Sequence, residues 1–326
     1  MSKERQKIGV ILLSALLASS LAYEAAGAAP SVSMTVITSD TAPIAQNIAL
    51  ETYKGACVSG QFEAFDAEGE AVIFNILTSP QKGDVAVTDG CKFVYSPHEG
   101  KKGTDEFTYT ATDESGNISA PAKVTIKIRK NEAGIKYSDM SERSAESAAI
   151  TLAERGIFTG ECIGSGYLFR PDESVTRGEF LAMCFAAAGT EITDASLRTT
   201  FLDDGDLSPW LRPYVAAAQA SGMIRGCVSC DGERVFLPDS PITVSQACVM
   251  LNNAFGITDV VGVFGADSVE AGEALQAAAN LSSCGIIDDS FAMSETLTRE
   301  KAAVMLSGAL DVTDTRGGAS LLKWAK

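Results

Sequence analysis

Two arginines stand where helix initiation gives no reason for a cation. Arg177 lies between Thr176 and Glu179, and Arg299 has the same place in a similar segment, so each is expected at the first position of a helix. The helix dipole mildly disfavours a positive charge there. A guanidinium group beside free helix N–H groups is, however, a good receptor for a carboxylate or phosphate. Both arginines are therefore candidate contacts for an acidic ligand. The alternative is an ion pair within the protein, with an acid such as Asp139.

The polar residues around these arginines are explained by helix initiation alone. Thr176 and Glu179 have the spacing of a capping box, in which the hydroxyl caps the backbone and the acid reaches back. Thr243 and Gln246 repeat that spacing. Thr298 begins a third helix, but the charged residues that follow it shift the pattern, so its cap should be weaker. We therefore expect a structural role for these five residues.

The helix starts belong to a unit that occurs three times in the C-terminal part of the chain. Each copy has a helical segment, a glycine-rich turn and a second, capped helix. A unit of this length cannot bury its apolar face alone, so the copies must stack on one another. The first copy reads Tyr137-Ser-Asp-Met, Gly156-Ile-Phe-Thr-Gly160, Phe169-Arg-Pro171 and Val175-Thr-Arg-Gly-Glu179; the second reads Phe201-Leu-Asp-Asp204, Gly222-Met-Ile-Arg-Gly226, Phe236-Leu-Pro238 and Ile242-Thr-Val-Ser-Gln246; the third reads Gly285-Ile-Ile-Asp288, Phe291-Ala-Met293 and Leu297-Thr-Arg-Glu-Lys301.

These segments resemble S-layer homology (SLH) repeats, whose pattern has an aromatic-x-Asp opening, a Gly-Ile-Ile-x-Gly turn, a Phe-x-Pro loop and a Thr-Arg-Ala-Glu helix start. The first copy keeps nearly all of it, with Gly178 in place of the alanine. The second has Val244 in place of the arginine, and the third has Ala266 where the opening Asp belongs. We place the repeats at residues 135–190, 199–256 and 260–312, with a C-terminal tail at 313–326.

The resemblance implies that the three repeats form an all-α, pseudo-threefold bundle with grooves between them, lined by arginines that grip cell-wall polysaccharide. By this likeness Arg177 and Arg299 are the leading ligand contacts. Val244 has no charge and cannot bind an anion as an arginine does, so at most two anion sites are expected.

Three further residues of the repeats are expected to contact the polysaccharide. Asp139 and Asp203 hold the family's opening-Asp position, where they would accept sugar hydroxyls or instead cap their own turns. Trp210 follows Pro209 near the opening of the second copy. Its indole would stack on a sugar ring or instead fasten the helix to the core of the repeat.

The preceding region, residues 29–130, has the alternating pattern of strands. Residues 107–112 and 122–128 place apolar side chains at every second position, and turn-forming residues separate such segments. This predicts an all-β sandwich. Phe93-Val-Tyr-Ser-Pro97 and Gly103-Thr-Asp-Glu-Phe-Thr-Tyr109 resemble bacterial immunoglobulin-like and cadherin-like surface modules. The likeness implies a multidomain chain, with an Ig-like sandwich before the SLH repeats and surface proteins as partners of that sandwich.

Calcium is a further ligand that the sequence brings into consideration. Cadherin relatives bind calcium with acidic loops, which here makes Asp66, Asp105 and Asp113 the candidates. Calcium takes six to eight oxygen ligands and the chain has no dense Asp-x-Asp-x-Asp loop, so we predict no metal site or cofactor and regard these residues as turn formers.

Eight cysteines suit an oxidising compartment. Cys57 and Cys91 are the two in the first domain, so they are expected to pair. Cys227 and Cys230 are expected to form a local or cross-repeat disulfide, because a zinc or redox site would need a second ligand pair or a strand and helix context.

The front of the chain and its charge indicate export. Residues 1–28 have a basic start, an uncharged run and a small-residue end, which is the pattern of a cleaved signal peptide. No later segment is apolar and long enough to span a membrane, so none is expected after cleavage. The formal net charge of −16 argues against nucleic acid as a partner.

Together these observations predict a non-catalytic cell-surface protein. The repeats would hold it non-covalently on an acidic cell-wall polysaccharide or a peptidoglycan-linked polymer, at the bacterial cell wall or S-layer, and it would display the Ig-like domain. The alternatives are an S-layer lattice subunit or adhesin, and, less favoured, an anchored cell-wall enzyme. No carboxylates stand in an acid and base pattern, and the single histidine, His98, lies in a polar turn, so we expect no enzyme activity.

Overall fold

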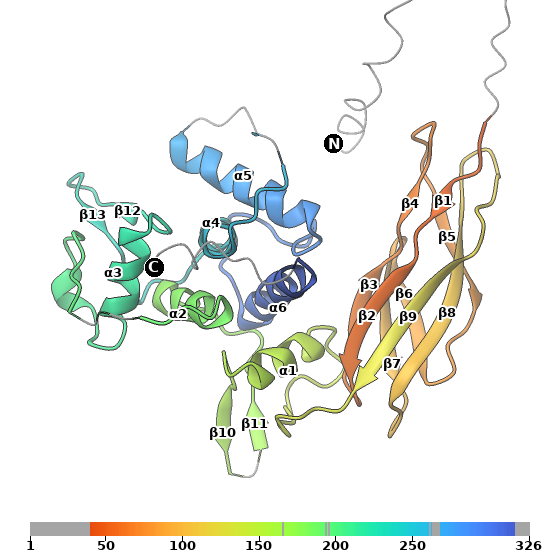
Figure 1. The fold of residues 1–326 in the computed structure, drawn as a ribbon, viewed down its shortest axis with the longest axis horizontal. Helices are drawn as coiled ribbons and strands as arrows, with labels where there is room; N and C mark the ends of the chain where they lie inside the picture. The colour runs from red at the N-terminus through yellow and green to blue at the C-terminus, as the bar shows by residue number, and fades with distance from the viewer. Residues whose placement is uncertain are drawn as a thin grey trace, which may run out of the picture.

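The structure, a computed structural model, describes residues 40–164, 166–192, 194, 196–260, 262 and 268–316. A β-rich region precedes a helical region, as predicted, and Figure 1 shows the two lying next to each other. The expected signal peptide, the expected opening of the third repeat at Ala266, and the tail beyond residue 316 lie outside the described residues. Within the described ranges, none of the helices combines the length and the apolar composition that crossing a bilayer requires.

The β-rich region contains two facing sheets and a short additional strand pair. Apart from β2 and β9, which run parallel, all paired strands are antiparallel. The four-stranded sheet has the order β2 (Ile48–Tyr53), β9 (Ala122–Arg129), β8 (Gly103–Thr112) and β5 (Ile73–Thr78); the three-stranded sheet has the order β3 (Val58–Gln61), β7 (Lys92–Pro97) and β6 (Gly83–Asp89); β1 (Ile44–Ala45) pairs with β4 (Ala64–Phe65).

The core of this region follows from the alternation along its strands. In β8 the side chains of Phe107 and Tyr109 are buried, and so are those of Val124 and Ile126 in β9. They pack against aromatic side chains from the opposite sheet, including Phe93, whose ring lies at 88° to that of Phe107. Edge-to-face packing of this kind adds stability beyond the burial of apolar area. The predicted sandwich therefore forms.

The helical region has six helices among the described residues, together with two short hairpins that the sequence did not suggest. Helix α1 packs on α6, α3 packs on α2, and α5 packs on α4. Helices α2, α4 and α6 also contact one another (Figure 1). The elements are α1 (Glu146–Glu154), β10 (Glu161–Ile163), β11 (Gly166–Leu168), α2 (Arg177–Ala187), the 3-10 helix η1 (Asp204–Asp206), α3 (Arg212–Ala220), β12 (Cys227–Val228), β13 (Arg234–Val235), α4 (Val244–Phe255), α5 (Val269–Ser283) and α6 (Arg299–Thr315).

The segments that enter α2, α4 and α6 meet in a closed cycle of backbone hydrogen bonds. The N–H group of Val175 donates to the carbonyl of Leu297 at 3.0 Å, Leu297 donates to Ile242 at 2.8 Å, and Ile242 donates back to Val175 at 3.0 Å. All three side chains are fully buried. Each segment therefore contacts both of the others, and the three helix starts are held around one centre.

The two regions are joined at Glu154, the last residue of α1. Its carboxylate accepts hydrogen bonds from the hydroxyl of Tyr53 at 2.8 Å and from the N–H group of Glu132 at 2.6 Å, and Arg129 lies 3.6 Å away as an ion pair. Tyr53 also belongs to the hydrophobic core of the helical region. A separate ion pair joins Lys92 of β7 to Asp288 at 2.8 Å.

The expected disulfides are absent: all eight cysteines, Cys227 and Cys230 included, are free thiols in the structure. Strand register explains the case of Cys57 and Cys91. Because Val58 pairs with Tyr95 and Gln61 with Lys92, the two cysteines lie at opposite ends of the β3–β7 pair. Five residues of strand separate their positions by roughly 16 Å. A disulfide needs Cα atoms within about 7 Å.

Glu146, in the first turn of α1, is a buried acid whose stability effect should depend on pH. Burial raises the pKa of this carboxyl to about 7 from its usual 4.5, against the smaller opposing effect of Lys136. A raised carboxyl pKa means that the folded state prefers the protonated form, so stability should fall as the pH rises from 4.5 through 7.

We therefore expect Glu146→Gln to raise the free energy of unfolding at pH 8, by on the order of 1 kcal/mol, and to change it little at pH 4.5. Urea unfolding of both proteins at the two pH values measures this. An equal effect of the substitution at both pH values would contradict the assignment.

Candidate functional site

The three helix starts have the caps that the threonine spacing predicts. Thr176 accepts from the N–H group of Glu179 at 3.2 Å, and the carboxylate of Glu179 accepts from the N–H group of Thr176 at 2.9 Å. Thr243 and Gln246 form the same reciprocal pair at the start of α4. At the start of α6, Thr298 caps the N–H group of Lys301 at 3.3 Å without a reciprocal bond. The weaker third cap agrees with the shifted charge pattern there.

The remaining N–H groups of these first turns are not free, which corrects the expectation of an anion site made by helix N–H groups. Arg177 N–H donates to the carbonyl of Ser240 at 3.0 Å, and Gly178 N–H donates to Pro238 at 2.9 Å. The start of α6 donates in the same way to Glu173 and Pro171, and the start of α4 donates to Glu295 and Met293. Any negative ligand must therefore be attracted by side chains.

Gly178 stands where the family pattern has alanine, and the packing explains this departure. A Cβ atom on Gly178 would lie 2.6 Å from Cδ2 of Leu211 and 3.2 Å from the carbonyl oxygen of Pro238. The space is thus filled by Leu211, which leads into α3.

Arg177 is a buried cation without an acidic partner. The residue is only 5 % exposed, its Nε donates to the carbonyl of Phe236 at 2.7 Å, and its guanidinium lies over the Phe236 ring, 5.2 Å from the centroid. Among the described residues, none forms an ion pair with it. Burial lowers the pKa of Arg177, because desolvation outweighs the attraction of Cys227 and Asp203. The attraction of Asp203 acts from beyond ion-pair distance, so no carboxylate of the described residues is in direct contact with the guanidinium.

Arg299 has the equivalent position at the start of α6, but its charge is neutralised by acidic side chains. Its Nη1 lies 3.0 Å from the carboxylate of Glu173 and 3.8 Å from that of Glu161, and the guanidinium lies over the ring of Phe158. Arg170 pairs with the same two acids, at 2.8 and 2.7 Å. The structure thus shows the alternative considered for this arginine, an internal ion pair, although with acids other than Asp139.

At the start of α4, Val244 is fully buried and provides no charge. The aromatic residue of the neighbouring loop, Phe291, is covered instead by the ammonium group of Lys301, 5.5 Å from the ring centroid. That ammonium group is paired with Glu295 at 2.7 Å. The three equivalent positions therefore differ: one arginine is unpaired, one is paired, and one is replaced.

The opening aspartates hold the Phe-x-Pro loops. Asp139 accepts from the N–H groups of Phe169 and Arg170 at 2.9 and 2.7 Å. Asp203 accepts in the same way from Phe236 and Leu237, at 2.9 and 2.8 Å. Arg170 and Leu237 have φ of 56° and 57°, in the left-handed region. The carboxylates thus brace a strained loop about thirty residues away rather than capping their own turns.

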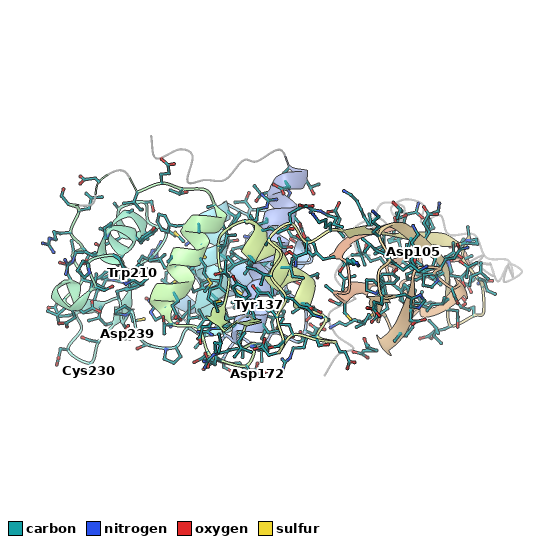
Figure 2. All side chains as sticks on the ribbon, turned by 90° about the horizontal axis from the view of Figure 1, so that it is seen from below. Asp105, Tyr137, Asp172, Trp210, Cys230 and Asp239 are labelled. Carbon is teal, nitrogen blue, oxygen red and sulfur yellow. The ribbon has the colours of Figure 1, made fainter. Side chains whose placement is uncertain are left out.

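Trp210 is exposed, but it does not line the groove described below. Its side chain is 57 % exposed and its ring contacts that of Tyr214 edge-on, with the centroids 6.4 Å apart. Figure 2 places Trp210 in the helical region, at the end far from Asp105 of the sandwich.

A groove of about 1410 Å³ opens beside Arg177. One wall is the Gly222–Gly226 turn with the hairpin β12–β13, the floor is α4, and the opposite wall is α5, which lies beside α4 in Figure 1. The charged residues that line it are Arg177, Arg225, Arg234, Glu270 and Glu273. The α5 wall was missed from the sequence, where its run of alanines and mixed polar residues carries no motif.

The acidic loops of the sandwich bring together a different set of residues from the predicted one. Asp40, Glu70 and Asp113 have carboxylate oxygens within 4.8 Å of one another. Burial and the neighbouring acids raise the pKa of Glu70. Asp105 is outside this group: it accepts from the N–H groups of Gln81 and Lys82 and from the hydroxyl of Tyr95.

Asp66 is likewise bound to its own turn, accepting from the N–H groups of Glu68 and Glu70. Of the three predicted calcium candidates, Asp113 alone joins the acidic group.

Comparison with known proteins identifies two domains. Residues 40–127 match the model of the bacterial Ig domain, and residues 136–181 match that of the S-layer homology domain. An amylopullulanase of Thermoanaerobacterium thermosulfurigenes is 28 % identical over 129 residues, which are 39 % of this chain and 7 % of that enzyme. The chain therefore spans a small fraction of the length of this curated relative.

Solved structures align only weakly with this chain, and two examples show this. The adhesin SrpA from Streptococcus sanguinis aligns at 17 % identity and a TM-score of 0.25, over 38 % of this chain and 81 % of that one. An endo-fucoidan hydrolase from glycoside hydrolase family 107 aligns at 17 % identity and a TM-score of 0.23, over 27 % and 14 %. At these TM-scores neither alignment establishes a common fold.

The chain thus carries a bacterial Ig domain followed by an S-layer homology domain. S-layer homology domains bind cell-wall polymers, and the presence of one indicates a surface protein attached to the cell wall.

Proposed function

We propose that the protein is a non-catalytic cell-wall anchor with three SLH repeats, at residues 135–190, 199–256 and 260–312, arranged as a pseudo-threefold bundle. The closed cycle through Val175, Ile242 and Leu297 supports three equivalent segments, because each donates to one neighbour and accepts from the other. The equivalent contacts of the helix starts with the Phe-x-Pro loops support the same arrangement. The repeats bind an acidic wall polysaccharide or a peptidoglycan-linked polymer, and the Ig domain is displayed.

One observation carries the assignment of the binding groove: Arg177 lines it without a carboxylate at ion-pair distance. A largely buried guanidinium has lost most of its hydration, and an acidic group that binds there restores a charge-assisted contact. Arg299 already has that compensation from Glu173 and Glu161. We therefore infer a single strong anion site rather than two, in the groove where Arg177 at the start of α2 meets the Gly222–Gly226 turn, α4 and α5.

A role as S-layer lattice subunit or adhesin is the second candidate, and exposed apolar side chains of the Ig domain favour it. Ile44 of β1 lies opposite Phe65 of β4, and both side chains are 61 % exposed. Such side chains are suited to protein contacts. An anchored enzyme is disfavoured, because His98, the single histidine, lies on the exposed surface of the sandwich, 3.0 Å from Asp84.

The test is sedimentation of the purified full chain with isolated bacterial cell walls, before and after chemical removal of the secondary polymers. We expect retention on untreated walls and its loss from stripped walls. Retention that is equal on both, or absent from both, would contradict the proposal.

A further inference from the structure

The groove beside Arg177 contains two further arginines. Arg225, in the Gly222–Gly226 turn, and Arg234, on β13, line the same groove. Nη1 of Arg234 donates to the carbonyl oxygen of Arg225 at 2.8 Å, so the two residues are adjacent. Among the described residues, Arg234 has no ion pair. With Glu270 and Glu273 on the opposite wall, the lining carries three arginines and two acids.

Arg225 is held by an acid from the opposite wall. Its guanidinium forms an ion pair with the carboxylate of Glu273 on α5, which spans the groove from the turn to the helix. The two side chains are 61 % and 34 % exposed. An ion pair this exposed contributes about 0–1 kcal/mol. A charge-assisted contact to a ligand contributes about 1.5–3 kcal/mol, so an acidic group of a ligand can displace Glu273.

The position of Arg225 in the glycine-rich turn is not occupied by a cation in the other two repeats. Thr159 occupies it in the first repeat and Asp288 in the third. The arginine is thus specific to the groove that also contains the unpaired Arg177, which links the two residues to one ligand.

We propose that Arg225 forms a second anion subsite, which Glu273 fills in the free protein and which a second acidic group of the same glycan fills in the complex. This inference rests on the proposed function and narrows it. The ligand is a polysaccharide whose acidic groups recur along the chain, with one bound at Arg177 and the next at Arg225. Glu273 acts as an internal competitor that the ligand must displace.

Three variants of the full chain separate this role from a merely structural ion pair, with the same isolated cell walls as the probe. Arg225→Gln should weaken binding about tenfold, the loss of one charge-assisted contact. Glu273→Gln should strengthen it about threefold, because Arg225 is released from its competitor. The double variant should match Arg225→Gln. Glu270→Gln is the matched control: it removes the same charge from the same wall of the groove, and it should have less effect than Glu273→Gln.

Oligosaccharides released from the walls by mild acid and separated by charge complete the test. The gain from Glu273→Gln should appear with fragments that carry two or more acidic groups and vanish with fragments that carry one. The inference is overturned if wild type binds walls through Arg177 and Glu273→Gln binds no better than Glu270→Gln. Absence of wild-type binding would instead overturn the proposed function itself.

Discussion

Replacing Arg177 by methionine is expected to abolish retention on cell walls while leaving the protein folded. In the proposed site the guanidinium supplies the charge-assisted contact to the ligand, and such contacts contribute about 1.5–3 kcal/mol, or roughly ten- to a hundredfold in affinity. Folding should suffer little, because methionine keeps the buried stem against Phe236 and removes a charge that has no acidic partner. We expect the free energy of unfolding to change by less than about 1 kcal/mol.

Quantitative sedimentation with walls, combined with urea unfolding, measures both effects. Arg299→Met is the matched control, because this arginine has the equivalent position but is already neutralised by Glu173 and Glu161. The affinity of the Arg299→Met variant for cell walls should fall by less than about threefold. Equal losses for the two variants would mean that both grooves bind. A loss of stability that accompanies the loss of binding in Arg177→Met would make the arginine a structural residue.

Asp203→Ala should cost on the order of 3 kcal/mol of stability, because it leaves two backbone donors without an acceptor. One of them, the N–H group of Phe236, belongs to a fully buried residue, and Leu237 is held in the left-handed region by the same carboxylate. Loss of this brace should also move the Phe236 carbonyl that Arg177 contacts. Thermal and urea unfolding give the stability change.

Asp206→Ala is the control for charge, since Asp206 is an exposed acid of the neighbouring 3-10 helix. It should stay within about 0.5 kcal/mol of wild type. If Asp203 contacts the glycan directly, as the family likeness also allowed, its alanine variant would lose wall binding at low temperature with its stability intact. That result would refute the bracing role.

The features that the sequence predicts well are local. A threonine with an acid or amide three residues later specifies a helix start, so the caps at Thr176 and Thr243 are predictable. Alternation of apolar residues likewise specifies the buried faces of β8 and β9. Both signals act within a few residues of chain, so they depend little on which distant segments meet.

The features that the sequence misses depend on which segments meet. Arg177 and Arg299 each follow a capping threonine, yet Arg299 pairs with two acids and Arg177 with none, because different loops lie opposite them. The separation of Cys57 from Cys91 depends on strand register, which composition does not reveal. The α5 wall of the groove has no motif, so its part in the site emerges only from the packing.

The hydrogen-bonded cycle through Val175, Ile242 and Leu297 constrains how such a protein can evolve. A linear array of repeats gains or loses copies at its ends, because each copy contacts only its neighbours. A ring has no ends, and deleting one member leaves the other two with unmatched donors and acceptors at the centre. In the proposed bundle of three repeats, the number of copies is therefore fixed. A segment such as the one that enters α4, where Val244 provides no charge, is kept because it closes the cycle.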